Sequence, residues 1–375
     1  MGFADLSGLA YPWDTLVPYA QRARAHARGI VDLSVGTPVD PTPAVVREAL
    51  AAASDAHGYP TTHGTPALRE AVSAWFARRR GVAGLDPDAV LPTVGSKELV
   101  GLLPSLLNLG PGDVVVHPRT AYPTYDVGAR LAGATPLATD DVDDWAGRAG
   151  VRLVWVNSPS NPTGRVLGAA HLARVVAAAR EIGAVVASDE CYAELAWTEP
   201  YASAGVPSLL DPAVCGGSHD GLLVTYSLSK QSNVAGYRAA FVAGDRALVS
   251  GLLATRKHLG MIVPAPVQAA MVAALSDDPH VAVQREVYAR RREALLGGAS
   301  AAGLVVDDGE AGLYLWARRA DGPADCWQTV SDLADLGILV GPGSFYGPAG
   351  ERHVRIALTA TDERVHEAAA RLSRG

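Results

Sequence analysis

The sequence predicts an α/β protein built around a large, mostly parallel and doubly wound sheet. Short apolar runs of strand length follow one another along the chain, at residues 114–117, 151–156, 184–188, 222–226 and 239–243. Several of them lack alternating polar residues, which is typical of parallel strands covered by helices on both faces. Residues 172–182, between two of the runs, have a helical pattern that ends at Gly183. This strand–helix–strand order favours a doubly wound domain.

Helical periodicity is clearest upstream of these runs. One helix face is formed by Leu68, Ala71, Val72, Trp75 and Phe76. The three arginines at 78–80 and the glycine after them are typical of a helix C-terminus. We therefore expect the three arginines to form a solvated helix end.

The chain of 375 residues is long enough for two domains of roughly 100–200 residues each. Hydrophobic residues make up 49% of it, so we expect a large buried core rather than disorder. After about Pro279 the pattern changes, since residues 280–302 resemble one long charged helix and a shorter α+β region follows. A second, smaller domain is expected there.

Composition argues against several classes of partner. The net charge is −7, from 32 basic and 39 acidic residues, so the sequence does not predict the basic surface that binds nucleic acid. The three cysteines lack zinc-ligand spacing, so we expect no metal and a reduced, cytoplasmic setting. The N-terminus lacks the regions of a signal peptide. No apolar run reaches the ~18–20 residues that cross a bilayer, so we expect no membrane association.

Polar segments directly follow three of the predicted strands, at residues 157–164, 189–192 and 227–230. Ligands of an open α/β sheet bind beyond the carboxyl ends of its strands. We therefore expect an amide, a carboxylate and an amine to meet at one rim of the sheet.

Such a set of groups suits pyridoxal 5′-phosphate (PLP), which needs a lysine, a carboxylate for its ring nitrogen and anion binders for its phosphate. Lys230 and Asp189 supply the first two. Arg238, eight residues after the lysine, has a planar guanidinium group whose N–H donors can bind the phosphate. The carboxylate would keep the ring nitrogen protonated. Tyr192 and Asn161 are candidate hydrogen-bond donors to the phenolic oxygen of the ring.

Each of these residues alone has an ordinary explanation. A lysine after a strand is usually a solvated loop residue, an acidic pair is often a helix cap, and Asn-Pro commonly starts a turn. The combination and its spacing favour the PLP site. The glycine-rich segment 341–347 does not match a dinucleotide-binding pattern, because its sixth position is Tyr346, which argues against an α/β oxidoreductase.

These motifs give the chain a resemblance to the fold-type I, class I/II aminotransferases that runs through almost the whole sequence. It is carried by VGTPVDPTP with Gly36, YPTTHGTPALRE with Tyr59, Gly95-Ser96-Lys97, AYPTY with Tyr122, NPTG with Asn161, SDECY with Asp189 and Tyr192, SLSKQSNVAGYR with Lys230 and Arg238, and VRIAL with Arg355. The resemblance implies a fold-type I PLP transferase. Its large PLP-binding domain would span residues 34–280, and a small α+β domain would combine residues 1–33 and 281–375.

The resemblance also implies the catalytic roles. Lys230 would hold PLP as a Schiff base and shuttle protons, and Asp189 would pair with the pyridine nitrogen. Tyr122 would stack on the ring, while Tyr192 would bond to the phenolic oxygen. Arg355 would clamp the substrate α-carboxylate bidentately, with Gly36 and Asn161 beside it.

The phosphate would be bound by the backbone of Ser96 and Lys97 at a helix N-terminus, together with Ser227 and Arg238. Tyr59 would reach this phosphate across a subunit interface. The resemblance therefore implies a homodimer of two-fold symmetry.

Within this family the pattern is close to the N-succinyldiaminopimelate aminotransferases, through stretches such as PWDTL, GSKELV, CGGSHDGLL and RKHLGMIVPAPVQAAM. This group implies ping-pong transfer of an amino group from L-glutamate to N-succinyl-2-amino-6-oxopimelate in lysine biosynthesis. The aspartate branch of the family carries an arginine just before a segment like VPAP, whereas residues 258–266 here, HLGMIVPAP, contain none. The candidates that remain for the distal carboxylate or succinyl group are Lys97, Lys257, His258, Arg22 and Arg24.

Other activities share these motifs. Another pair of amino acid and keto acid, a carbon–sulfur β-lyase or an aminocyclopropane carboxylate synthase would use the same cofactor residues. Formation of pyridoxamine phosphate with glutamate distinguishes a transaminase from the last two. A non-catalytic PLP sensor would need a DNA-binding module, and the aminotransferase pattern that begins near residue 11 leaves no room for the ~60 residues of one.

Overall fold

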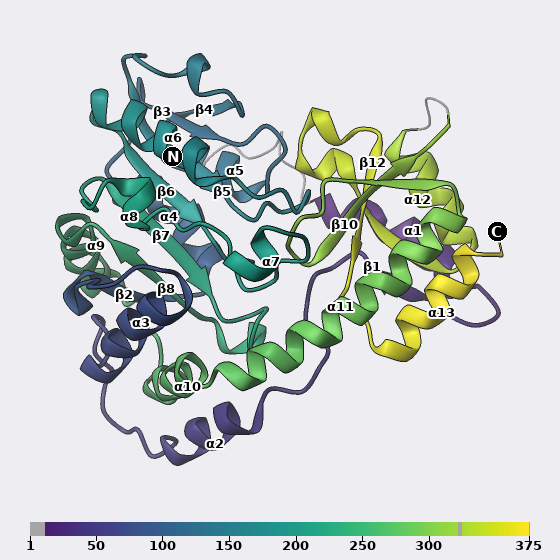
Figure 1. The fold of residues 1–375 in the computed structure, drawn as a ribbon, viewed down its shortest axis with the longest axis horizontal. Helices are drawn as coiled ribbons and strands as arrows, with labels where there is room; N and C mark the ends of the chain where they lie inside the picture. The colour runs from purple at the N-terminus through teal and green to yellow at the C-terminus, as the bar shows by residue number, and fades with distance from the viewer. Residues whose placement is uncertain (1–11, 322–324, 375) are drawn as a thin grey trace, which may run out of the picture.

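The computed structural model describes residues 12–321 and 325–374, which contain two sheets (Figure 1). The larger sheet has seven strands in the order β2 (Val90–Val94), β8 (Ala239–Gly244), β7 (Leu222–Ser227), β6 (Val185–Asp189), β5 (Val151–Asn157), β3 (Val114–His117) and β4 (Thr135–Ala138). All of its pairings are parallel except those of β8, which runs antiparallel to both of its neighbours. The predicted α/β fold with a mostly parallel sheet is therefore confirmed.

The reversed direction of β8 follows from its connection to β7. Two parallel neighbours need a crossover of a dozen or more residues, usually with a helix. Only residues 228–238 separate β7 from β8, and among them the structure forms one 3₁₀ turn, Ala235–Tyr237. This short segment, which carries Lys230, turns back at the rim of the sheet and so keeps the lysine there.

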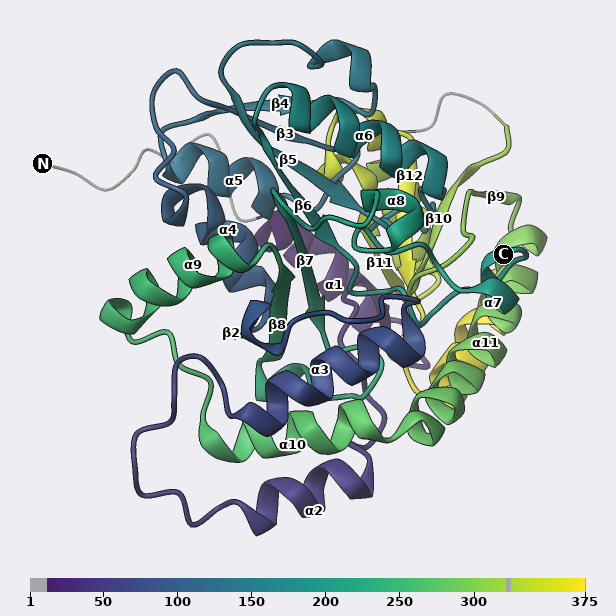
Figure 2. The ribbon, with the colours of Figure 1, turned by 60° about the vertical axis from the view of Figure 1, so that its left-hand side comes forward.

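Helices cover both faces of the large sheet. Trp75 of α3 (Pro66–Arg79), Val175 of α6 (Ala169–Glu181) and Met271 of α10 (Ala265–Ser276) belong to one buried apolar cluster. The opposite face is covered by α4 (Ser96–Leu106), α5 (Thr124–Leu131) and α9 (Arg246–Leu259), which lie along one side of the sheet in Figure 2. Val114 and Val116 of β3 face the first cluster and Val115 the second, so the strand is buried on both faces, as its lack of polar alternation predicted.

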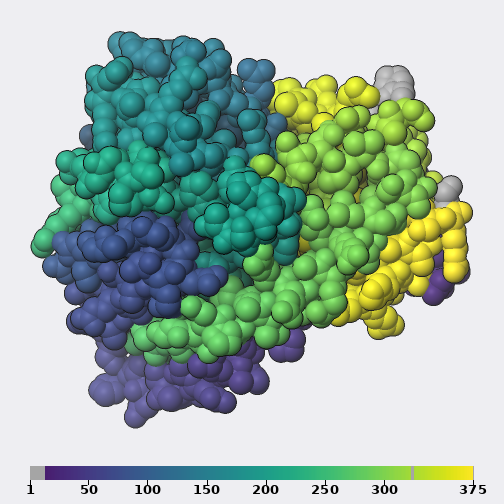
Figure 3. Space-filling model, viewed as in Figure 1, coloured from purple at the N-terminus to yellow at the C-terminus, as the bar shows by residue number. Residues whose placement is uncertain are grey.

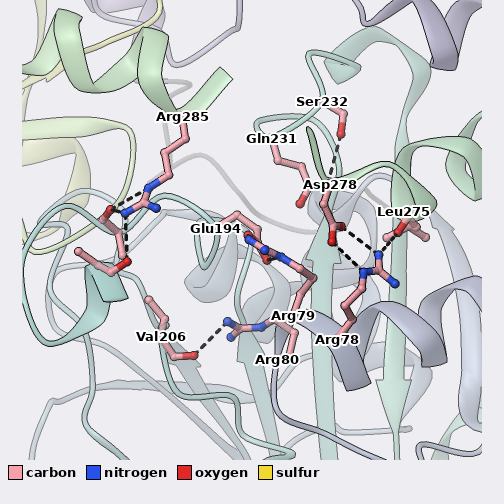
Figure 4. A network of polar contacts seen from close by, with 12 residues as sticks. Arg78, Arg79, Arg80, Glu194, Val206, Gln231, Ser232, Leu275, Asp278 and Arg285 are labelled. Atoms are coloured by element: carbon pink, nitrogen blue, oxygen red, sulfur yellow. Dashed lines mark hydrogen bonds and ion pairs between the residues drawn. The ribbon is translucent and has the colours of Figure 1, made fainter. Parts of the chain in front are cut away.

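The expectation that the three arginines at the end of α3 lie in solvent is wrong for Arg80. Its side chain is 1% exposed and donates to the Oε2 of Glu190 at 2.9 Å, so that it has a charge partner. It also donates to the Val206 carbonyl at 3.0 Å (Figure 4). Arg78 and Arg79 are part-exposed and bond to Asp278 and Glu194. The end of α3 therefore holds the segment that follows β6.

The smaller sheet has the order β1 (Val31–Leu33), β11 (Ile338–Pro342), β12 (His353–Ala357), β10 (Tyr314–Arg319) and β9 (Leu304–Asp307). It packs with α1 (Val17–Arg24), α12 (Cys326–Asp335) and α13 (Asp362–Leu372). Strand β1 pairs with β11 in parallel, so the N-terminal segment lies beside the C-terminal part of the chain. The domain bounds at 34 and 281 stay a prediction, and residues 1–11 of the expected small domain lie outside the described residues.

The long helix α11 (Asp278–Ala301) runs along both parts, and Figure 3 shows its green residues at the surface, below the teal part and beside the yellow part. The shorter helices are α2 (Ala44–Ala52), α7 (Tyr201–Ala204) and α8 (Pro212–Cys215), with 3₁₀ turns at Pro12–Leu16, Pro87–Ala89, Val142–Asp144, Gly343–Tyr346 and Pro348–Gly350. Within residues 12–321 and 325–374, no helix has the length and apolar character that a membrane crossing requires.

Candidate active site

A cavity of about 300 Å³ lies at the carboxyl ends of β5, β6 and β7, where it also meets β10 and β12 of the smaller sheet. The sequence-predicted site residues that line it are Gly36, Ser96, Lys97, Tyr122, Asn161, Asp189, Tyr192, Ser227, Lys230, Arg238 and Arg355. Eleven of the twelve predicted residues therefore meet in one place, although they come from segments more than 300 residues apart.

Lys230 lies three residues after the end of β7. Its Nζ donates a hydrogen bond to the carbonyl oxygen of Gly36. Burial lowers the pKa of the Lys230 amine below its usual range, and the positive charges of Arg355 and Arg238 lower it further. A lowered pKa raises the fraction of neutral amine, which is the form that adds to a carbonyl carbon.

Asp189 is the last residue of β6 and is buried. Its Oδ1 accepts a hydrogen bond from the Cys191 backbone N–H at 3.1 Å, and its Oδ2 accepts one from the Tyr125 hydroxyl at 3.0 Å. Burial raises the pKa of its carboxyl group, although these hydrogen bonds act in the opposite direction. No cation of the described residues forms an ion pair with it, so this buried carboxyl group fits a protonated ring nitrogen of PLP.

The other end of the cavity is suited to a phosphate. Helix α4 begins at Ser96, and no side chain caps its N-terminus, so its first N–H groups are open to a ligand. The backbone carbonyl of Arg238 accepts from the Gly95 N–H at 2.9 Å, and a Cβ built on Gly95 would lie 2.1 Å from the Arg238 guanidinium. The glycine therefore lets Arg238 lie directly over the helix N-terminus, and the Ser227 and Ser229 hydroxyls line the same cavity.

Arg355 lies within β12, and its side chain is buried at the wall of the cavity. Its Nη1 donates to the Asn161 Oδ1 at 3.0 Å, and its Nη2 donates to the Ser34 carbonyl at 2.7 Å. Its Nε has no hydrogen-bond partner among the described residues. A buried guanidinium with a free N–H and no carboxylate partner is the arrangement expected of a site for a substrate carboxylate.

The two predicted tyrosines of the cofactor site both line the cavity. The Tyr192 hydroxyl lies 3.2 Å from the Tyr314 hydroxyl, and burial raises the pKa of Tyr192 well above its usual value. The ring of Tyr122 packs edge-on against Tyr125, with the Lys97 Nζ 5.6 Å from its centre.

Tyr59 is the predicted residue that the structure leaves outside the cavity. It lies between α2 and α3 with its side chain fully exposed, and its contact with a second subunit stays a prediction. Of the five candidates for the distal carboxylate or succinyl group, Lys97 alone lines the cavity. Arg22 instead donates to Ser331 at 2.6 Å on another part of the surface.

Ten lining residues are absent from the predicted site, among them Trp13, Tyr125, Cys191, Ser229 and Tyr314, which carry aromatic, thiol or hydroxyl groups. Three of these five lie within three residues of a predicted site residue, so sequence proximity was an available signal for Tyr125, Cys191 and Ser229. Trp13 and Tyr314 carry no such signal, because they reach the cavity through the packing of the smaller sheet.

Comparison with known proteins agrees with this geometry. The family model described as aminotransferase class I and II matches residues 28–372. The 4-dedimethylamino-4-oxo-anhydrotetracycline transaminase OxyQ of Streptomyces rimosus is 58% identical over 363 residues, which cover 97% of this chain and 98% of that protein.

Two solved structures share the fold. An aminotransferase from Neisseria meningitidis is 31% identical, with a TM-score of 0.88 and coverage of 99% of each chain. A Thermus thermophilus protein described as a probable N-succinyldiaminopimelate aminotransferase is 29% identical, with a TM-score of 0.84 and coverage of 96% of this chain and 99% of that one. The chain therefore belongs to the class I and II aminotransferases, and its cofactor is pyridoxal 5′-phosphate.

Proposed function

We propose that the cavity is the active site and that its residues divide the work of transamination between them. The observation that carries this proposal is the convergence of Lys230, Asp189, Arg238 and Arg355 on one cavity. When bound, PLP withdraws electrons from the bond that breaks at the substrate α-carbon. The described residues fit it because they offer a lysine, a buried carboxyl group without a cation, and an uncapped helix N-terminus beside an arginine.

Lys230 would hold the cofactor through its amine, and the same amine, once free, would take up the proton that leaves the substrate α-carbon. The neutral amine needed for this step is favoured by the lowered pKa of Lys230. Asp189 would keep a proton on the ring nitrogen, Tyr192 would donate to the phenolic oxygen, and Tyr122 would pack on the ring. Ser227, Arg238 and the backbone of Ser96 and Lys97 bind the phosphate.

Arg355 binds the substrate α-carboxylate, which brings the α-carbon toward Lys230. Its two bonds to Asn161 and Ser34 fix the guanidinium plane before the substrate arrives. Fixed donors of this kind need no rearrangement when the ligand binds, which favours a defined orientation of the reacting bond. Gly36 and Asn161 lie beside the same carboxylate.

We propose L-glutamate as amino donor and N-succinyl-2-amino-6-oxopimelate as acceptor. The likeness to the Thermus thermophilus protein described as a probable N-succinyldiaminopimelate aminotransferase supports the acceptor. Lys97 supports it as well, because it places a flexible cation in the cavity that can meet a distal carboxylate.

The 58% identity with OxyQ favours a second candidate acceptor, a polycyclic ketone of the kind named for that transaminase. The aromatic side chains of Trp13 and Tyr122 at the cavity offer flat apolar faces to such a molecule.

A panel of acceptors tests both candidates. The enzyme is first converted with L-glutamate to its pyridoxamine form, which the loss of absorbance near 420 nm reports. The succinylated oxopimelate, oxopimelate without the succinyl group, an aromatic polycyclic ketone and 2-oxoglutarate are then added separately. Fastest return of the absorbance with the succinylated acceptor supports the first candidate, and fastest return with the polycyclic ketone replaces it with the second.

We propose that the active unit is a homodimer in which Tyr59 of one subunit binds the phosphate in the site of the other. The full exposure of Tyr59 fits this role, because the side chain is accessible to a second subunit. Tyr59→Phe should weaken PLP binding without changing the size of the particle, as measured by light scattering.

A further inference from the structure

Tyr314 is the first residue of β10, and its nearly buried side chain lines the active-site cavity. Strand β10 pairs antiparallel with β12, so that Trp316 lies opposite Arg355. Side chains two residues apart on a strand share a face. Tyr314 is therefore the diagonal neighbour of Arg355, and the register of these two strands places its ring against the guanidinium.

The ring of Tyr314 lies flat against the charged end of Arg355. The guanidinium carbon is 4.0 Å from the centre of the Tyr314 ring and 5.0 Å from that of Tyr346. An arginine that lies on an aromatic face gains a cation–π contact and loses freedom to rotate out of its plane. The orientation of the Arg355 guanidinium thus depends on the Tyr314 ring as well as on Asn161 and Ser34.

The hydroxyl of Tyr314 points to the opposite part of the site. It lies 3.2 Å from the Tyr192 hydroxyl, and a Cβ added to Gly36 would lie 2.0 Å from it. Gly36 in turn accepts the hydrogen bond of the Lys230 amine. The phenol therefore lies among three residues to which the proposed function assigns roles.

The charges around this phenol stabilise its polar oxygen in the buried site. Burial raises the pKa of Tyr314, but the positive charges of Arg355 and Lys230 and the hydrogen bond with Tyr192 outweigh it and hold the pKa below its usual value. The pKa of Tyr192 is raised, first by burial and then by the neighbouring phenol. A hydroxyl group has one proton to donate, so when Tyr192 donates to the phenolic oxygen of the cofactor, the Tyr314 hydroxyl is the donor to the Tyr192 oxygen.

We propose that Tyr314 is a positioning residue with two separable roles: its hydroxyl holds the hydroxyl of Tyr192, and its ring holds the plane of the Arg355 guanidinium. This inference rests on the proposed roles of Tyr192, Lys230 and Arg355. The two roles use different atoms of one side chain, so two substitutions separate them.

Tyr314→Phe removes the hydroxyl and keeps the ring, whereas Tyr314→Leu removes both. The first measurement is a pH titration of the visible absorbance of the PLP-loaded enzyme. Without its partner, Tyr192 is held less firmly and stabilises the anionic oxygen of the cofactor less, because hydrogen bonds in a chain strengthen one another. We expect the midpoint to rise by about 0.5 pH unit or more in both variants.

The second measurement is the Kd of glutarate, an unreactive dicarboxylate, from its effect on the same absorbance. We expect Tyr314→Phe to bind glutarate within about twofold of the unchanged enzyme, and Tyr314→Leu to bind it roughly tenfold more weakly. Tyr346→Phe is the matched control, because this neighbouring tyrosine also lies over Arg355 but its hydroxyl has no partner among the described residues. Neither measurement should change in that control.

A midpoint that does not rise in Tyr314→Phe overturns the role of the hydroxyl, and unchanged glutarate binding in Tyr314→Leu overturns that of the ring. Tyr192→Phe and Arg355→Lys separate these failures from a failure of the proposed function. If Tyr192→Phe leaves the midpoint unchanged, or Arg355→Lys leaves the Kd unchanged, the assigned roles of those two residues are wrong. If both have effects and the Tyr314 variants have none, only the present inference fails.

Discussion

Arg80, at the end of α3, and Arg355, in the middle of β12, are both almost completely buried, but their surroundings differ. Arg80 meets the buried carboxylate of Glu190, which also accepts from Ser208 and the Leu209 N–H. Arg355 meets an amide, a carbonyl and two aromatic rings, with no carboxylate among the described residues. A satisfied charge holds the fold together, whereas a charge without a counterion marks the place where a ligand supplies it. Substitution of Arg80 should therefore change mainly the free energy of unfolding, whereas substitutions in the active site should change mainly the rate of the reaction.

The largest expected effect is on the active-site side. Lys230→Ala should lower kcat by on the order of 10⁶ while the unfolding midpoint changes little, because the group that moves the proton is lost. Steady-state rates with glutamate and thermal melting measure the two quantities, and Lys257→Ala, which removes an exposed lysine outside the cavity, serves as a control. Near-normal turnover of Lys230→Ala would show that another group carries the chemistry.

Arg80→Ala should have the opposite pattern. It leaves Glu190 buried without its charge partner, which costs roughly 3–5 kcal/mol in the free energy of unfolding. Urea denaturation measures this, and the rate per folded molecule should remain close to that of the unchanged enzyme. Arg80→Ala combined with Glu190→Gln should recover part of the loss, and a loss below about 1 kcal/mol in the single variant would contradict the structural role.

Arg355→Lys keeps the positive charge but loses the planar guanidinium group, which can donate two parallel hydrogen bonds to one carboxylate. We expect kcat/KM for glutamate to fall by about a hundredfold, with little change in stability because no ion pair is broken. The ratio of kcat/KM for glutamate to that for an amine without an α-carboxylate is the decisive measurement. If both substrates lose the same factor, Arg355 is not the carboxylate site.

The smallest expected effect is that of pH on uptake of the cofactor. The neutral amine of Lys230 reacts with PLP, so the rate of reconstitution of the cofactor-free enzyme rises with pH through the pKa of this lysine. Because burial lowers that pKa, the rate should reach its plateau below the ~10.4 of a free lysine. Stopped-flow absorbance measures it, and a plateau only above that value would contradict the lowered pKa.

Central strands were easier to predict than edge strands. Val114–His117 is an uninterrupted apolar run between Asp113 and Pro118, and the observed strand has the predicted bounds. Strands β2 and β4 went unpredicted because each contains a proline, Pro92 and Pro136. Both lie at the edges of the large sheet, which is where a strand tolerates the loss of a backbone donor.

The same distinction applies to the site. Lys230, Asp189 and Asn161 could be predicted because they follow parallel strands, whose carboxyl ends meet at one rim. Tyr314 could not, because its place depends on the register of β10 against β12, which no local pattern fixes. Burial of Arg80 depends likewise on Glu190, a residue 110 positions away.

Helix α11 joins the two parts of the molecule as a rigid rod. Its first residue, Asp278, is bonded to Arg78, and further along Arg291 bonds to Asp40 and Asp362. With 24 residues it is about 36 Å long, so a swing of about 5° at its start displaces the far end by about 3 Å. Because the far part of the helix packs against α13 and β9, its direction fixes where the smaller sheet stands at the wall of the active-site cavity.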